Sequence, residues 1–183
     1  KAMRPPVFYN SFRLTIIGAG LSLILGGPYI KGLFTVPIAS NNIYEQQYQM
    51  HRFVVEYYKK PVAVNDLGYV SYKNPYYVLD LAGLGSKKAF YYRKKELHSE
   101  WLEIIIKDYN VGLAMIYDVW FKEIPMNWIK IGTLTLSRHK ITPACREVSF
   151  YATNLNEYYE INEKLKSFIT TLPRGVTFSW GTR

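Results

Sequence analysis

The sequence has a single cysteine, Cys145, among its 183 residues. One cysteine cannot form an internal disulfide and leaves no cysteine pair for a structural zinc site. The three histidines, His51, His98 and His139, have no His-x-x-x-His spacing, so we expect no metal site and a solvated surface position for each. The sequence also lacks a Gly-x-Ser-x-Gly elbow and a Walker phosphate loop. It therefore identifies no catalytic residue and no cofactor.

Acidic residues are few relative to basic ones, with 14 Asp and Glu against 23 Lys and Arg and a formal net charge of +9. Such an excess suits nucleic acid, anionic lipid head groups or phosphate-bearing substrates. Zinc-knuckle, RNP-type and basic helix-turn-helix patterns are absent, so we expect no nucleic-acid partner. The basic residues form small clusters rather than one run, at Lys59 and Lys60, Lys87 and Lys88, and Arg93 to Lys95.

An uncharged apolar segment extends from Leu14 to Ile30. As a helix rising about 1.5 Å per residue it measures roughly 25 Å, close to the thickness of a hydrocarbon core. Lys1, Arg4 and Arg13 precede it, whereas only Lys31 follows closely. The positive-inside rule therefore predicts a membrane-spanning helix with a cytoplasmic amino end and an extracytoplasmic remainder.

Two other interpretations of this segment stay open. A cleaved secretory signal has a similar basic start and apolar stretch, although the small-residue candidate for cleavage at 37–39 is poor. A buried helix of a soluble protein has a similar length. Because the chain starts at Lys1 rather than Met, we expect residues upstream, and the glycines of the segment suit packing against upstream transmembrane helices.

The domain organisation predicted is 1–36, a last transmembrane helix with its flanks, and 37–183, a small extracytoplasmic α/β domain. Thr35 to Ala39 has the character of a short linker. A helix is predicted from Asn42 to Tyr58, opened by a capping box between Asn42 and Glu45 and ended by Pro61.

Alternating strands and helices follow, which favours a three-layer-like α/β arrangement with a mixed sheet. The first two apolar runs are typical of buried parallel strands, and the later alternating ones of antiparallel strands. The predicted strands are Val62–Val64, Tyr76–Leu81, Gly112–Tyr117, Trp128–Leu136, Val148–Thr153 and Val176–Trp180, and the predicted helices are Ser86–Lys107 and Asn156–Thr171.

Acidic residues stand at or near the carboxyl ends of three predicted strands, the edge where ligands bind in open parallel sheets. Their carboxylates can accept hydrogen bonds from sugar hydroxyls, and neighbouring aromatic side chains offer faces for ring contact. An alternative is that each Asp only caps the following helix. The candidate ligand-binding residues are Asp66, Tyr69, Asp80, Asp118 and Trp120, with Tyr72 as a further aromatic face.

The segment Val78 to Gly85 looks like the glycine-rich first motif of methyltransferases that use S-adenosylmethionine, because glycine lets the backbone approach a cofactor. However, another strand precedes it, and Lys88 occupies the third glycine position of a full GxGxxG. A tight structural turn is the favoured interpretation.

Three phrases occur in order, SNNIYEQQYQM at 40–50, VAVNDLGY at 62–69 and VLDLAGL at 78–84. Together they resemble the tail of bacterial polytopic membrane glycosyltransferases of the dolichyl-phosphate-mannose protein mannosyltransferase type, over about Arg13 to Ser86. The resemblance implies sugar transfer from a polyprenyl-phosphate-linked donor to a glycan or protein acceptor at the bacterial inner membrane. The catalytic acids of such enzymes lie in an early extracytoplasmic loop that this chain does not contain, so no catalytic residue is carried over.

Three functional hypotheses result. The first is the carboxyl-terminal part of such a glycosyltransferase, whose domain positions substrate or stabilises the enzyme while its basic clusters hold phosphate head groups. The second is a non-catalytic membrane-anchored binding or assembly module. The third is a domain related to methyltransferases, with cofactor contacts at Gly83 and Gly85.

Overall fold

The computed structural model describes residues 7–95 and 100–181, with side chains from residue 11 onward. Lys1 and Arg4 of the charge argument, and His98, lie outside the described residues. The chain divides into two compact units, Lys1–Ile38 and Ala39–Arg183.

The first unit consists of the apolar part of helix α1 (Val7–Glu45). This helix is long and apolar enough to cross a membrane, and none of its most apolar window is buried. Leu23, Ile24 and Leu25, for example, are 67%, 76% and 67% exposed. Such exposure disagrees with the interpretation of a buried core helix, because a core helix covers its apolar side chains with protein.

The predicted linker and the predicted helix start at Asn42 are both wrong, because α1 continues through 35–45. Asn42 does not cap a helix: its amide group donates to the carbonyl oxygen of His139 at 3.1 Å and accepts from the backbone of Ile141 at 2.8 Å. Glu45, the other member of the predicted capping box, pairs with Arg138 at 3.1 Å. These long-range partners explain why the local pattern misplaced the boundary.

The helical segment resumes as α2 (Gln47–Arg52) and a π-helical turn, η1 (Phe53–Tyr58), which ends where Lys59 adopts a left-handed conformation. The predicted end before Pro61 is therefore confirmed. The shorter helices that follow are α3 (Gly68–Ser71), α4 (Lys87–Lys94), α5 (Glu100–Asp108), the 3-10 turn η2 (Asp118–Trp120) and α6 (Leu155–Ile169).

The single helix predicted over Ser86–Lys107 is instead two helices, α4 and α5, and residues 96–99 between them lie outside the described part. The Ser86 hydroxyl accepts from the backbone N–H of Ala89 at 3.2 Å and so caps α4. Asn154 caps α6 in the same way, by accepting from the N–H of Glu157 at 3.0 Å.

The described residues form a six-stranded mixed sheet in the order β2-β1-β3-β5-β4-β6. Strand β1 pairs in parallel with β2 and β3, and the remaining pairs are antiparallel, as the sequence predicts. The strands are β1 (Val62–Val64), β2 (Val78–Asp80), β3 (Leu113–Ile116), β4 (Ile129–Leu136), β5 (Glu147–Ala152) and β6 (Val176–Trp180).

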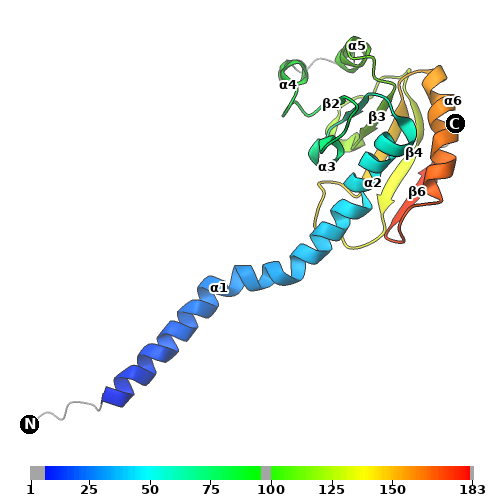
Figure 1. Cartoon of the computed structure of the whole chain (residues 1–183). Helices are drawn as coiled ribbons and strands as arrows, with labels where there is room; N and C mark the ends of the chain where they lie inside the picture. The colour runs from blue at the N-terminus through cyan, green and yellow to red at the C-terminus, as the bar shows by residue number, and fades with distance from the viewer. Residues whose placement is uncertain (1–6, 96–99, 182–183) are drawn as a thin grey trace, which may run out of the picture. The chain divides into compact units, whose positions relative to one another are not determined.

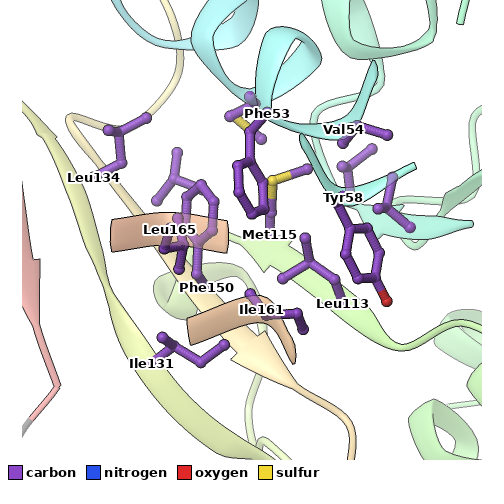
Figure 2. Packing of buried hydrophobic residues seen from close by; sticks show 14 of the residues in the cluster. Phe53, Val54, Tyr58, Leu113, Met115, Ile131, Leu134, Phe150, Ile161 and Leu165 are labelled. Carbon is purple, nitrogen blue, oxygen red and sulfur yellow. The ribbon is translucent and has the colours of Figure 1, made fainter. Parts of the chain in front are cut away.

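Helices cover both faces of the sheet, so the domain has three layers (Figure 1). On one face, α2, η1 and α6 pack over an aromatic cluster in which the Phe53 ring lies 5.1 Å from that of Phe168 and 6.0 Å from that of Phe150. Figure 2 shows Phe53 and Phe150 in this cluster. On the other face, α4 and α5 bury Leu102 and Ile105 against the strands. Each fully buried side chain of this size contributes about 1.5–3 kcal/mol, which makes the sheet a rigid support for its edges.

Candidate functional site

The carboxyl ends of β1 and β3 form the topological switch point of the sheet. From β1 the chain leaves towards β2, whereas from β3 it leaves in the opposite direction towards β4. Ligands of open α/β sheets bind in the crevice that such divergence creates. Asn65 joins the two ends, because its side-chain oxygen accepts from the backbone N–H of Tyr117 at 2.8 Å.

Asp66 lies at this switch point and is held by two donors. Its Oδ2 accepts from the Tyr117 hydroxyl at 2.8 Å and from the Gln47 side-chain amide at 2.6 Å. The Tyr117 oxygen also lies 3.0 Å from Oε1 of Gln46. Burial, with the Asp66 charge adding to it, raises the pKa of Tyr117 well above its ordinary value, so this hydroxyl stays a donor.

Asp80 is the last residue of β2, and its carboxylate bonds the turn after that strand. Its Oδ1 accepts from the N–H of Ala82 at 2.7 Å and its Oδ2 from the N–H of Gly85 at 2.5 Å. Gly83 adopts a φ of +89°, and a Cβ there would lie 2.7 Å from the backbone of Phe90. This geometry is that of the tight structural turn favoured from the sequence, and Asp80 shapes it with both oxygens.

Asp118 follows β3 but bonds towards β4 and β5. It accepts from the hydroxyls of Ser149 at 2.8 Å and Tyr151 at 3.2 Å, and it pairs with Lys130 at 2.9 Å. Its neighbour Trp120 is 37% exposed and packs at 5.6 Å, edge-on, against Tyr117. The structure therefore places Trp120 next to Tyr117, whose hydroxyl bonds Asp66. Asp118 instead bonds side chains of β4 and β5 and has no part in these contacts.

A hollow of about 290 Å³ lies beside Asp118 and includes Cys145. Burial raises the pKa of the Cys145 thiol, so the thiol remains protonated at neutral pH and is a weak nucleophile. Among the described residues, no group of three or more His, Cys, Asp or Glu could hold a metal ion.

Next to Asp66, five rings form a surface row that we name the aromatic strip: Tyr44, Tyr48, His51, Tyr69 and Tyr72. Tyr44 stacks on Tyr48 at 5.4 Å, Tyr48 meets the edge of Tyr69 at 5.5 Å, and Tyr69 lies 5.7 Å from Tyr72. Their exposed fractions are 47% for Tyr44, 36% for Tyr69 and 55% for Tyr72. The strip thus offers several solvent-facing rings in fixed positions.

Gln47 connects the aromatic strip to Asp66. Its Oε1 accepts from the backbone N–H of Tyr69 at 3.2 Å, while its Nε2 donates to Asp66. His51, which we expected at a solvated surface position, is instead partly buried in the strip and bonds the carbonyl oxygen of Val70 at 3.2 Å. The other described histidine, His139, is exposed as expected.

Sequence reasoning found Tyr69 and Tyr72 but missed Tyr44, Tyr48 and His51. The missed residues follow one another at spacings of four and three, which places side chains on one face of a helix. That spacing is the signal that could have identified the strip, although it does not tell which element packs beside it.

No curated protein and no solved structure matches the chain. One family model, described as a domain of unknown function (DUF8728), matches residues 41–151. The match includes β1 to β4, all of β5 except its last residue, Asp66 and all five rings of the aromatic strip. The chain therefore belongs to this family, the domain of unknown function DUF8728.

Proposed function

We propose that residues 39–183 form the extracytoplasmic substrate-positioning domain of a bacterial inner-membrane glycosyltransferase that uses a polyprenyl-phosphate-linked sugar. The observation that carries this proposal is the aromatic strip beside Asp66. The three phrases that resemble such transferases also support it, because Gln46 and Gln47 of the first phrase bond Asp66 or its partner Tyr117, and Asp66 belongs to the second.

The strip and Asp66 provide complementary contacts for a sugar. The apolar C–H face of a pyranose packs on an exposed aromatic ring, and Tyr69 and Tyr72 present such rings. Within the described part of the chain, Asp66 accepts hydrogen bonds from Gln47 and Tyr117, and both of them reach Oδ2. Oδ1 is therefore the atom that accepts a hydrogen bond from a sugar hydroxyl.

A membrane tether keeps a lipid-linked ligand near this surface. Residues 31–38 connect the apolar segment to the domain as part of helix α1, and as a helix these eight residues rise only about 12 Å. A sugar anchored by a polyprenyl tail in the same bilayer is then concentrated near the domain, which raises its effective concentration without any new contact.

The second candidate is a membrane-anchored binding or assembly module without a part in sugar transfer. It is favoured by Asp80 and Asp118, whose bonds are directed to their own turn and strands rather than to an open surface. Under this alternative, substitutions in the aromatic strip change association with other proteins and leave sugar binding at background.

The test uses the whole chain in lipid nanodiscs, with polyprenyl-phosphate mannose and polyprenyl-phosphate glucose as ligands and unglycosylated polyprenyl phosphate as reference. We expect saturable binding of at least one glycosylated lipid, weakened in Tyr69→Ala by about twofold to twelvefold, since a ring contact is worth about 0.5–1.5 kcal/mol. The matched control is Tyr159→Ala, which removes a tyrosine that is 58% exposed on α6. Equal binding of glycosylated and unglycosylated lipid would contradict the proposal.

A further inference from the structure

A second hollow, of about 460 Å³, lies beside the edge strand β2. It opens between the first turn of α4 and the residue that follows α5. The lining residues are Tyr77, Gly85, Ser86, Lys87, Lys88, Tyr91 and Tyr109. None of them belongs to the aromatic strip, so this hollow is distinct from the site described above.

Three tyrosines give the hollow aromatic walls. The rings of Tyr77 and Tyr109 stack at 5.2 Å with an interplanar angle of 15°. Tyr91, from α4, is 53% exposed and stands among the lining residues. Stacked and solvent-facing rings of this kind hold a planar or pyranose ring through its apolar faces.

In the part of the chain that the structure describes, the lining of the same hollow includes two lysines and no carboxylate. Residues 84–95 contain five Lys and Arg and no Asp or Glu. Lys87 is exposed, and Lys88 forms an ion pair with Asp108. One of the two lysines that line the hollow is thus matched by a carboxylate, whereas Lys87 has no ion pair among the described residues.

Backbone donors add to the lysines at the start of α4. The N–H of Ala89 donates to the Ser86 hydroxyl and that of Phe90 to the Ser86 carbonyl oxygen. The N–H groups of Lys87 and Lys88 precede these and have no carbonyl partner within the helix. The Asp80 carboxylate accepts from the N–H of Gly85 and so fixes the position of the chain that leads into α4.

We infer that this hollow binds a phosphate ester joined to a ring, with the phosphate at Lys87, Lys88 and the first turn of α4 and the ring against Tyr77, Tyr91 and Tyr109. The side chain of Lys87 and the backbone donors neutralise the phosphate charge, and Lys88 exchanges part of its contact with Asp108 for the ligand. A lipid-linked sugar phosphate and a soluble sugar phosphate share this chemistry. The inference does not require the transferase proposed above.

The experiment measures dissociation constants by calorimetry for the whole chain in nanodiscs made of zwitterionic lipid. The probes are mannose 1-phosphate, polyprenyl-phosphate mannose, inorganic phosphate and mannose. We expect mannose 1-phosphate to bind more tightly than inorganic phosphate or mannose alone, and Lys87→Gln to weaken it by at least about tenfold, the effect of losing one charge-assisted contact.

The matched control is Lys94→Gln, which makes the same change of charge in the same helix but outside the hollow. It should weaken binding by less than about twofold, as expected for a screened surface charge. If Lys87→Gln alters the tryptophan emission of the domain, Tyr91→Ala replaces it, with an expected loss of several-fold through the ring contact.

Three results would overturn the inference: no saturable binding of any phosphate probe, equal losses in Lys87→Gln and Lys94→Gln, or binding of mannose as tight as that of mannose 1-phosphate. If mannose 1-phosphate and polyprenyl-phosphate mannose bind equally tightly, the ligand is the sugar phosphate group itself. If polyprenyl-phosphate mannose binds more tightly, the ligand is the lipid-linked form in the membrane. Both outcomes support the phosphate site. Tyr159→Ala, on a residue that belongs neither to this hollow nor to the aromatic strip, should leave binding of mannose 1-phosphate unchanged. Because Lys87→Gln leaves the aromatic strip intact, its loss of binding assigns the phosphate to this hollow.

Discussion

The hydroxyl of Tyr117 donates to Oδ2 of Asp66 at 2.8 Å, and this bond ties the end of β3 to the end of β1. The two residues are 51 positions apart in the chain. The backbone N–H of Tyr117 also donates to the side chain of Asn65. Both the side chain and the main chain of Tyr117, just after β3, therefore bond to residues just after β1. The switch point is therefore a preformed, rigid edge on which a ligand surface can be built.

The first prediction concerns Tyr117→Phe. The substitution removes the hydroxyl and leaves the partly buried Asp66 carboxylate with one donor fewer, so we expect a loss of about 1–3 kcal/mol in the free energy of unfolding. Urea unfolding of the whole chain in detergent measures it through tryptophan fluorescence, since all four tryptophans follow residue 100 and report on the domain. Tyr159→Phe, on an exposed ring, should change the free energy by less than about 0.5 kcal/mol. Equal effects of the two substitutions would mean that the bond to Asp66 adds no stability.

The second prediction concerns the turn after β2. Gly83→Ala forces a side chain into a left-handed backbone and against the Phe90 backbone, so we expect a loss of about 1–3 kcal/mol. In the same turn, the nearest atom to a Cβ at Gly85 is the end of the Leu67 side chain at 3.3 Å, and Asp80 lies at an ordinary contact distance of 3.8 Å, so Gly85→Ala should cost clearly less. Thermal unfolding of both variants tests this order, and the account of the turn fails if Gly85→Ala is the more damaging of the two.

The third prediction concerns alkaline pH. Burial, with nearby carboxylates adding to it, raises the pKa of Tyr58, Tyr117 and Tyr151 above the ordinary value of about 10. The folded state then keeps protons that the unfolded state releases, so the stability they contribute is complete below about pH 10 and is lost as the pH rises further. Absorbance at 295 nm should show a class of tyrosines that ionise only together with unfolding. Simple titration of every tyrosine near pH 10 in a folded chain would contradict this.

The fourth prediction concerns acid pH and Glu160. Hydrogen bonds from Lys164 and Lys60 lower the pKa of Glu160 below its ordinary value of 4.5. A lowered pKa contributes stability that is present above pH 4.5 and is lost as the pH falls below it. Glu160→Gln should therefore flatten the dependence of stability on pH between about 5 and 3. Glu163→Gln, which removes a more exposed ion pair with Lys166, should leave that dependence nearly unchanged.

The local pattern of apolar and polar residues was sufficient to predict the strands of the sheet. The apolar runs at Val62–Val64 and Tyr76–Leu81 and the alternation at Trp128–Leu136 are set by which side chains face a core, and that information lies in neighbouring residues. The structure has strands within all three runs. The same reasoning located Asp66 and Asp118 at strand ends. It could not assign their partners, because Tyr117 and Ser149 reach them from other strands.

Long-range contacts explain what the sequence did not predict. Asn42 reads locally as a helix cap, yet its side chain bonds the backbone of His139 and Ile141, about a hundred residues later. The aromatic strip likewise depends on α3 packing beside α2, which joins Tyr69 to Tyr48. For Asn42, these tertiary contacts override a local capping preference of about 1 kcal/mol.

The most direct test of the account asks whether α1 spans a bilayer with the domain outside. Cys145→Ala removes the native thiol, and single cysteines are then placed by Met126→Cys, at a side chain that is 99% exposed, and by Ser11→Cys, before the apolar segment. In spheroplasts of a bacterial host, a membrane-impermeant maleimide should label Met126→Cys at once and Ser11→Cys only after permeabilisation, with the protein retained in membranes after alkaline carbonate. Release by carbonate, or labelling of Ser11→Cys but not Met126→Cys in intact spheroplasts, would contradict it.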